Sequence, residues 1–423
     1  MKKTTAFIIS HEPDATRAVE NQATSVIALT LTRALGREGI KVVRIHPSHF
    51  DDSLYSRYSH ATEICPNLHE SESDLVAFLD RLGDRYPGTK VLVPASDDCA
   101  LFLARHADKI HQDFVLLNPV PATMECIKDK QRQYALAVAA GVPVPETYFP
   151  DSKAEVAQIA KKLNEYPYII SPLEAQKWQL KKYAAVTGGN KAIIVHSRAE
   201  LIDEYARIST TDSNLMIQEI ITGKDANVIT FLGYCSDAFK PLAHCISSKL
   251  RQSPVDFGNC TSTVTCHNDV VERYAKRLVN QCGYVGMVGV EFKYDPKKND
   301  YMLIEIKCRP VSTIGIAMAC GVNLPVVAYR DTIGEKQQPI FDWEDGVIWM
   351  RLLQDVAAGL ELRRHGRLTI SQWFRSIRGK RVHALLAFDD LLPFARFYAR
   401  YCRQQLGKWL SARQRAKYLR GPR

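Results

Sequence analysis

The strongest pattern in the sequence is Gly289-Val-Glu291-Phe-Lys-Tyr-Asp295, followed after five residues by Tyr301-Met-Leu-Ile-Glu305-Ile-Lys307-Cys-Arg309-Pro310. Both runs read as strands, and the polar residues between them are typical of a turn, so the sequence predicts a β-hairpin. Side chains of a strand alternate between its faces, so Glu291 and Lys293 share one face, as do Glu305, Lys307 and Arg309 on the second strand. A register is therefore available that places two carboxylates side by side among cations.

Two adjacent carboxylates raise each other's pKa unless a cation neutralises them. Magnesium would do so, because it takes carboxylate and phosphate oxygens together. A solvated hairpin with ordinary salt bridges is the alternative that periodicity alone leaves open.

The first hundred or so residues alternate between expected strands and helices. Strands are expected at 5–10, 41–45 and 90–94, and helices at 25–35 and 97–107. This alternation predicts an α/β domain with a parallel sheet. Ligands bind at the carboxyl ends of such strands, which makes Asp97 and Asp98 candidate ligand residues. The alternative is that Asp97 caps the following helix.

A second pattern begins after a helix expected at 127–140. Gly141-Val-Pro-Val-Pro145 stops that helix and reads as a hinge between domains. Six short β-branched strands follow with few helices between them, which predicts an α+β domain built on antiparallel sheet. They are expected at 166–170, 191–195, 215–218, 227–232, 288–294 and 301–307.

Several motifs in a fixed order resemble a known superfamily. They are Asp129-Lys130, Gly141 to Thr147, Tyr166-Pro-Tyr-Ile-Ile-Ser-Pro172, Gly188-Gly-Asn-Lys191, Ile217-Gln-Glu-Ile-Ile-Thr-Gly223, Val290-Glu-Phe-Lys293 and Ile304 to Arg309. From about residue 5 to residue 335 the chain resembles the ATP-grasp superfamily, and within it the carboxylate–amine ligase branch of D-aspartate ligase and carbamoyl-phosphate synthase.

The resemblance implies an ATP-grasp fold, α/β plus α+β, with a Rossmann-like pre-ATP-grasp domain at 1–118. A central subdomain with a glycine-rich loop is expected at 119–212, and a C-terminal ATP-grasp subdomain at 213–335. A helical extension with a basic amphipathic tail is expected at 336–423.

The resemblance also implies roles for individual residues, with ATP and Mg²⁺ as cofactors. Four residues match positions near the ATP phosphates: Lys130, Gly188, Gly189 and Lys191. The two glycines suit a phosphate-binding loop, because their backbone amides can approach an anion closely. Gln218, Glu219 and Ile221 match the strand that binds adenine, and Asp225 matches the acid that holds the ribose. Glu291 and Glu305 match the magnesium ligands.

The remaining matched positions are cations. Arg309 matches the residue near the transferred phosphate, and Lys249 and Arg251 match substrate-side or phosphate-side cations. Read without the resemblance, Gly188-Gly189 is a simple turn, and Lys249 and Arg251 belong to a basic surface strand.

Two positions depart from the family pattern. Ser171 stands where a lysine usually contacts phosphate, and Lys307 stands where an asparagine usually completes the magnesium shell. A protonated lysine has no acceptor and cannot ligate magnesium. Either the Lys307 ammonium takes the place of one metal ion, or it forms a salt bridge in an inactive site. Lys177, Lys181 and Lys182 are candidates to replace the missing phosphate lysine.

Charge is concentrated at the C-terminus. The chain carries +10, and residues 361–423 contain sixteen lysines or arginines and three acids, a net +13, so residues 1–360 sum to −3. From Phe394 onward aromatic residues fall at helical spacing between cations, which suits an anionic membrane surface or an acidic partner. A self-packed tail is the alternative. No nucleic-acid-binding motif accompanies these charges, so nucleic acid is not an expected partner.

The sequence as a whole predicts an ATP-dependent ligase that joins a small-molecule carboxylate to an amine. The alternative is a catalytically degenerate nucleotide-binding protein or scaffold at a membrane surface. No apolar run is long enough for a spanning helix or a secretory signal, so we expect the chain in the cytoplasm, with contact to the inner membrane face through 394–423.

Overall fold

The structure, a computed structural model, describes residues 4–11, 23–110, 112–117, 120–173, 177–179, 181–236, 240–255 and 258–419. Within these ranges the side chains of 179, 181 and 407–419 are not described. The chain forms two compact units, one of Met1–Leu116 with His383–Arg423 and one of Leu117–Val382.

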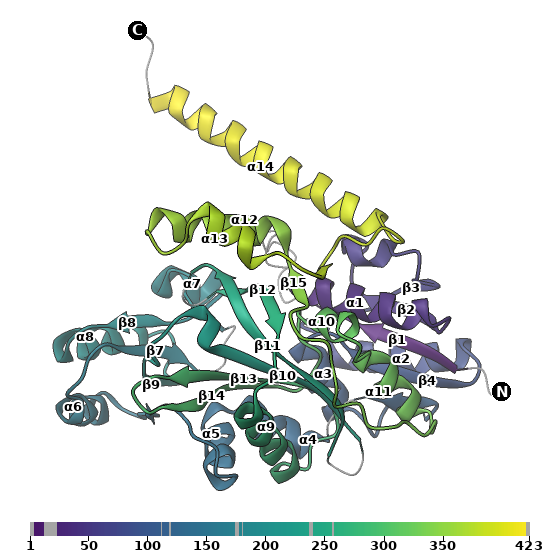
Figure 1. Cartoon of the computed structure of the whole chain (residues 1–423), viewed down its shortest axis with the longest axis horizontal. Coiled ribbons are helices and arrows are strands. Elements are labelled where there is room, and N and C mark those ends of the chain that lie inside the picture. Colours follow the sequence, from purple (N-terminus) through teal and green to yellow (C-terminus); the bar gives the residue numbers. More distant parts are fainter. Residues whose placement is uncertain are drawn as a thin grey trace. The chain divides into compact units, whose positions relative to one another are not determined.

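The first unit is built on a five-stranded parallel sheet in the order β3-β2-β1-β4-β5 (Figure 1). Its strands are β1 (Thr4–Ile9), β2 (Lys41–His46), β3 (Ala61–Ile64), β4 (Thr89–Pro94) and β5 (Phe114–Leu116). Its helices are α1 (Ala23–Arg37), the 3-10 turn η2 (Asp52–Tyr55), α2 (Glu72–Arg85), α3 (Asp97–Arg105) and α14 (Leu392–Leu419). The predicted parallel α/β domain is confirmed, although β3, α2 and β5 were not predicted.

Helix α3 begins at the carboxyl end of β4, and its cap differs from the one expected. The Ser96 hydroxyl accepts a hydrogen bond from the Cys99 amide at 3.2 Å, so Ser96 is the capping residue. Asp97 lies in the first turn of the helix, where a negative charge suits the helix dipole. The expectation that Asp97 caps this helix is therefore wrong.

The second unit contains two antiparallel sheets. The smaller sheet has the order β6-β9-β7-β8 and encloses an apolar core around Trp178, Ile170 and Leu201. Its strands are β6 (Thr147–Tyr148), β7 (Tyr168–Pro172), β8 (Ile193–Val195) and β9 (Leu215–Glu219). The helices of this part are α4 (Pro121–Lys128), α5 (Lys130–Ala139), α6 (Lys153–Lys162), the 3-10 turn η3 (Lys177–Gln179), α7 (Lys181–Thr187) and α8 (Arg198–Ile208).

The larger sheet has seven strands in the order β14-β13-β10-β11-β12-β15-β16, with α9 and α12 on opposite faces (Figure 1). Its strands are β10 (Val228–Cys235), β11 (Pro241–Ser253), β12 (Asn259–Thr265), β13 (Gly286–Asp295), β14 (Asp300–Lys307), β15 (Ile348–Met350) and β16 (Arg381–His383). Its helices are η4 (Asp225–Asn227), α9 (Asp269–Gln281), α10 (Gly315–Ala319), α11 (Leu324–Thr332), α12 (Leu352–Arg364) and α13 (Ile370–Ser376). The predicted antiparallel α+β class is confirmed.

Two details of this unit differ from the sequence prediction. The helix expected at 127–140 is two helices, because Asp129 adopts an extended conformation and caps α5 by accepting a hydrogen bond from the Arg132 amide at 3.0 Å. More helices interrupt the strands than expected, since α6, α8 and α9 all intervene. The break at Asp129 places Lys130 in the first turn of α5.

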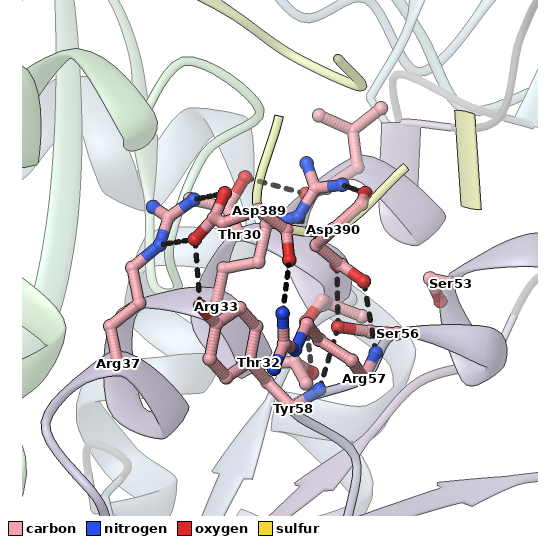
Figure 2. A network of polar contacts seen from close by, with 12 residues as sticks. Thr30, Thr32, Arg33, Arg37, Ser53, Ser56, Arg57, Tyr58, Asp389 and Asp390 are labelled. Carbon is pink, nitrogen blue, oxygen red and sulfur yellow. Dashed lines mark hydrogen bonds and ion pairs between the residues drawn. The ribbon is translucent and has the colours of Figure 1, made fainter. Parts of the chain in front are cut away.

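A cluster of ion pairs joins the C-terminal segment to α1 within the first unit (Figure 2). Asp390 accepts hydrogen bonds from Arg33 Nε at 2.8 Å, from Ser56 Oγ at 2.7 Å and from the Arg57 amide at 2.9 Å. The Arg33 and Asp390 side chains are only 5% and 1% exposed. Asp389 beside them is more exposed, and its carboxylate accepts two hydrogen bonds from the Arg37 guanidinium. We call this set of six residues the Asp390 clasp.

Helix α14 follows the clasp and packs on η2 of the same unit. Phe397 is buried, Arg396 lies 3.5 Å over the Tyr55 ring, and Arg400 donates to Asp52 at 2.5 Å. The helical prediction from Phe394 onward is confirmed. The side chains of α14 are described up to residue 406, and among them Phe397, Arg396 and Arg400 pack on the parallel-sheet domain.

Among the helices of the described residues, none combines the length and apolar character needed to cross a bilayer.

We predict that Asp390→Ala lowers the free energy of unfolding of the first unit by about 3 kcal/mol, because it leaves the buried Arg33 guanidinium without its carboxylate. Asp389→Ala is the matched control, and its solvent-exposed pair should cost less than about 1 kcal/mol. Urea unfolding followed by circular dichroism measures both. Equal losses in the two variants would contradict a special role for the buried pair.

Candidate functional site

The hairpin of β13 and β14 places its two acids directly opposite each other. Glu291 pairs with Glu305 across the strands, so the hairpin is confirmed and adopts the register that the sequence allowed. The register shifts immediately beyond this pair, and Phe292 faces Leu303, which leaves Ile304 as the extra residue of a β-bulge. Both acids are half-buried.

Each of these carboxylates has a lysine ammonium beside it. Lys307 Nζ lies 2.5 Å from Glu305 Oε1, and Lys249 Nζ lies 3.9 Å from Glu291 Oε2. Burial acts to lower the pKa of Lys249, but Glu291 and neighbouring acids outweigh it and raise that pKa. Lys249 therefore stays charged, and the acid pair is neutralised by cations of the protein itself.

Lys130 approaches the same acids from α5. Its ammonium donates to the carbonyl of the bulged residue Ile304 at 2.5 Å, and the Tyr134 hydroxyl donates to that carbonyl at 3.4 Å. Burial lowers the pKa of Lys130 to about 8, with Glu305 acting in the opposite direction. The bulge thus provides the acceptor that fixes Lys130 next to Glu305.

Lys191 belongs to the same electrostatic environment. Its Nζ donates to Asn259 Oδ1 at 2.9 Å, and burial together with Lys307 lowers its pKa to about 8. Four lysines and two glutamates from separate elements therefore influence one another within the second unit. Such a group of perturbed side chains is typical of a functional site.

The two predicted arginines lie in different surroundings. Arg309 is half-buried and donates through Nη1 to the Pro310 carbonyl at 2.9 Å. Arg251 is 3% exposed and makes a two-point ion pair with Asp355, at 2.8 and 2.9 Å. It also donates to Ser376 Oγ at 2.6 Å. The buried partner Asp355 gives Arg251 a structural function that the sequence did not indicate.

The residues assigned to adenine and ribose lie on β9 and the loop after it. Gln218 Nε2 donates to the Tyr134 hydroxyl and to Thr147 Oγ1, each at 2.9 Å. Glu219 accepts a hydrogen bond from the Glu146 amide at 2.8 Å and pairs with Lys298.

Further along the same segment, Ile221 is buried. Asp225 accepts from Gln252 Nε2 at 2.8 Å. Tyr134, one helical turn after Lys130, joins this segment to the bulge, and the sequence analysis missed it. Its spacing of four residues from Lys130 on a helix was the available signal.

Gly188 and Gly189 end helix α7. Both have positive φ, 69° and 72°, and the Gly188 amide donates to the Ala184 carbonyl at 2.9 Å. A left-handed residue at this position terminates a helix, and glycine adopts it without steric cost. Helix termination therefore explains the pair without a ligand, and its role over phosphates stays a prediction.

Ser171 lies on β7 and is 6% exposed, and its hydroxyl has no hydrogen-bond partner among the described residues. The nearby Lys177 is held by Asp212 at 2.7 Å, which also accepts from Trp178. Lys182 is exposed, and the Lys181 side chain lies outside the described residues. An arrangement in which Lys177 replaces the phosphate lysine would therefore require it to leave Asp212.

The donor set fits a magnesium ion in part. Two carboxylates opposed across a hairpin are ligands that magnesium prefers, together with phosphate oxygens. The Lys307 ammonium already touches one of them and offers no oxygen ligand. The residues present therefore fit one magnesium ion held by Glu291 and Glu305, with the Lys307 ammonium bound to Glu305.

Comparison with known proteins agrees with this geometry. Residues 251–352 match the family model described as ATP-grasp in the biosynthetic pathway with Ter operon. The chain is 21% identical over 297 residues to D-aspartate ligase of Enterococcus faecium, covering 68% of this chain and 70% of that protein. It is 22% identical over 237 residues to the C-terminal section of the carbamoyl phosphate synthase large chain of Methanopyrus kandleri, covering 54% and 41% respectively.

Among solved structures, N5-carboxyaminoimidazole synthetase of Staphylococcus aureus has a TM-score of 0.62 at 14% identity and covers 86% of each chain. The parallel-sheet domain and the two antiparallel sheets are thus the arrangement of a known fold. The chain therefore has the fold of the ATP-grasp enzymes, its residues 251–352 match an ATP-grasp family model, and it is similar in sequence to D-aspartate ligase.

Proposed function

We propose that this chain joins a small-molecule carboxylate to an amine at the expense of ATP, through an acyl phosphate. The observation that carries the proposal is the Glu291–Glu305 pair, set opposite each other and surrounded by four lysines. The similarity to D-aspartate ligase supports the same class of reaction.

The proposed reaction has two steps. A substrate carboxylate oxygen attacks the γ-phosphorus, the bond between the β- and γ-phosphates breaks, and ADP leaves. The amine then attacks the acyl carbon, inorganic phosphate leaves, and the amine loses a proton. Lys130, Lys249 and Arg309 would stabilise charge on the transferring phosphoryl group, with the amides of Gly188 and Gly189 covering it.

Glu291 and Glu305 would hold magnesium, which neutralises phosphate charge when bound. Lys307 departs from the family pattern, because the resemblance implies an asparagine that completes the metal shell at this position. In the structure the Lys307 ammonium is bonded to Glu305. We propose that Lys307 supplies the charge of a second ion, so that this site works with a single magnesium. It would also contact the phosphates that a lysine at Ser171 would have reached.

A catalytically silent nucleotide-binding protein is the second candidate. Ser171 and Lys307 favour it, because both replace residues that the family uses on phosphate and metal. Contact with an anionic membrane through residues 394–423 is compatible with both candidate functions. The described side chains of α14 neither require nor oppose it.

We predict that the wild-type chain releases ADP from MgATP when pooled amino acids and amines are supplied, and that Glu305→Gln lowers this release by about 10²-fold or more. Glutamine keeps the shape of the side chain but loses the charge that opposes Glu291. A coupled ADP assay measures both proteins. Nucleotide binding by both, with no ADP release above background from either, would establish the silent candidate.

Lys307→Asn should convert the site from one that binds a single metal ion to one that binds two. We predict tighter Mn²⁺ binding in the presence of nucleotide, with a second bound ion detected by electron paramagnetic resonance. Lys162→Asn on the exposed surface of α6 is the matched control and should keep the wild-type count. One ion in both wild type and Lys307→Asn would refute the replacement of a metal by lysine.

Nucleotide affinity should fall as the pH rises above 8. The pKa of Lys130 is lowered to about 8, so the free protein loses this ammonium above that pH, whereas phosphate binding favours the charged form. We expect the Kd for ATP to rise by up to about tenfold per pH unit between pH 8 and 9.5. Lys130→Arg should flatten this rise, because arginine stays protonated. Isothermal titration calorimetry tests it, and an unchanged slope in Lys130→Arg would assign the dependence to another group such as Lys191.

A further inference from the structure

A groove of about 740 Å³ runs along the outer face of α9, away from the acid pair. Its lining includes Lys240, Glu272, Arg273, Lys276, Arg277 and Phe341, and we call it the α9 groove. The α9 residues among them recur at spacings of three and four, so they form one face of the helix. The volume falls in the range of small-molecule sites, about 300 to 1,000 Å³.

The charges of the α9 groove are unbalanced. Arg273, Arg277 and Lys240 are exposed and make no ion pair with any residue that the structure describes, and the Arg273 guanidinium lies 5.6 Å from the centre of the Tyr274 ring. Glu272 is not available to them, because it binds Lys276 at 2.5 Å and lies 3.2 Å from His244. The other acid of the lining is Asp269, which lies exposed in the first turn of α9. Three cations without carboxylate partners therefore face one concave surface.

An aromatic side chain closes this surface. Phe341 is 44% exposed, and Lys276 lies 4.9 Å over its ring. Exposure of a large apolar side chain inside a groove is typical of a ligand site. An apolar contact is thus available beside the three cations.

Buried side chains support two lining elements of the groove, Phe341 and α9. His244 is fully buried, stacks on Phe231 at 5.0 Å and meets Phe341 at 5.0 Å. The inner face of α9 is buried by Val271, Leu278 and Val279.

The α9 groove is separate from the site on the hairpin. His244 and Lys249 both lie on β11, five residues apart in a regular stretch, so they are separated by about 17 Å and point to opposite faces of the sheet. A ligand in the groove would not contact the acid pair.

We propose that the α9 groove binds a small phosphate ester that carries an apolar group. Its phosphate would lie among Arg273, Arg277 and Lys240, where charge-assisted hydrogen bonds are strong, and its apolar part would contact Phe341. This proposal does not depend on the ligase reaction.

Phenyl phosphate and inorganic phosphate are the probes, titrated into the full chain and followed by isothermal titration calorimetry. We expect the double variant Arg273→Gln/Arg277→Gln to raise the Kd for phenyl phosphate at least about tenfold. Phe341→Ala should weaken phenyl phosphate about fivefold and leave inorganic phosphate unchanged. Thermal melting of each variant checks that it folds.

Arg363→Gln/Arg364→Gln is the matched control, since it removes two adjacent exposed arginines from α12. It should bind phenyl phosphate as the wild type does. The proposal is overturned if the wild type binds no phenyl phosphate, if the α9 double variant binds it normally, or if the control loses as much.

Discussion

The repulsion between Glu291 and Glu305 is the constraint on which the second unit depends. Like charges directly opposite each other destabilise a sheet, so this hairpin is acceptable only with cations around it. Those cations come from α5, β11, β14 and the segment before β8, as Lys130, Lys249, Lys307 and Lys191. Elements far apart in the sequence meet at one place, and that place is also the candidate site.

In each unit, a buried arginine forms an ion pair with an aspartate from the C-terminal part of the chain. Arg251 on β11 is neutralised by Asp355, and Arg33 on α1 is neutralised by Asp390. Both aspartates lie beyond residue 335, where the resemblance to the superfamily ends. Leaving a buried guanidinium without its carboxylate is strongly unfavourable, so this part of the chain completes the packing of both units. The C-terminal residues up to Asp390 are thus integral to the fold.

The sequence predicted the parts of the structure that rest on local patterns. Alternation along 289–310 was sufficient for the hairpin and allowed the observed pairing of Glu291 with Glu305, because a strand has a strict two-residue period. It failed for β11, since Lys249, Arg251 and Gln252 are buried there and hide the apolar alternation of the strand. The break at Asp129 was missed because helical periodicity continues through it. The partners of Arg251 and Gln218 lie about a hundred residues away, and no local pattern identifies them. The metal and nucleotide assignments came from the resemblance rather than from periodicity.

The bulge at Ile304 has a consequence for how a nucleotide would be captured. A lysine on a helix surface normally samples many rotamers, and ordering it on a ligand costs free energy at the moment of binding. Lys130 is already held by the Ile304 carbonyl, so its conformational entropy is lost during folding. An arriving phosphate would only have to replace the neutral Ile304 carbonyl as the acceptor of the Lys130 hydrogen bond. An irregularity in one edge strand thus shifts part of the cost of recognition from the binding step to the assembly of the sheet.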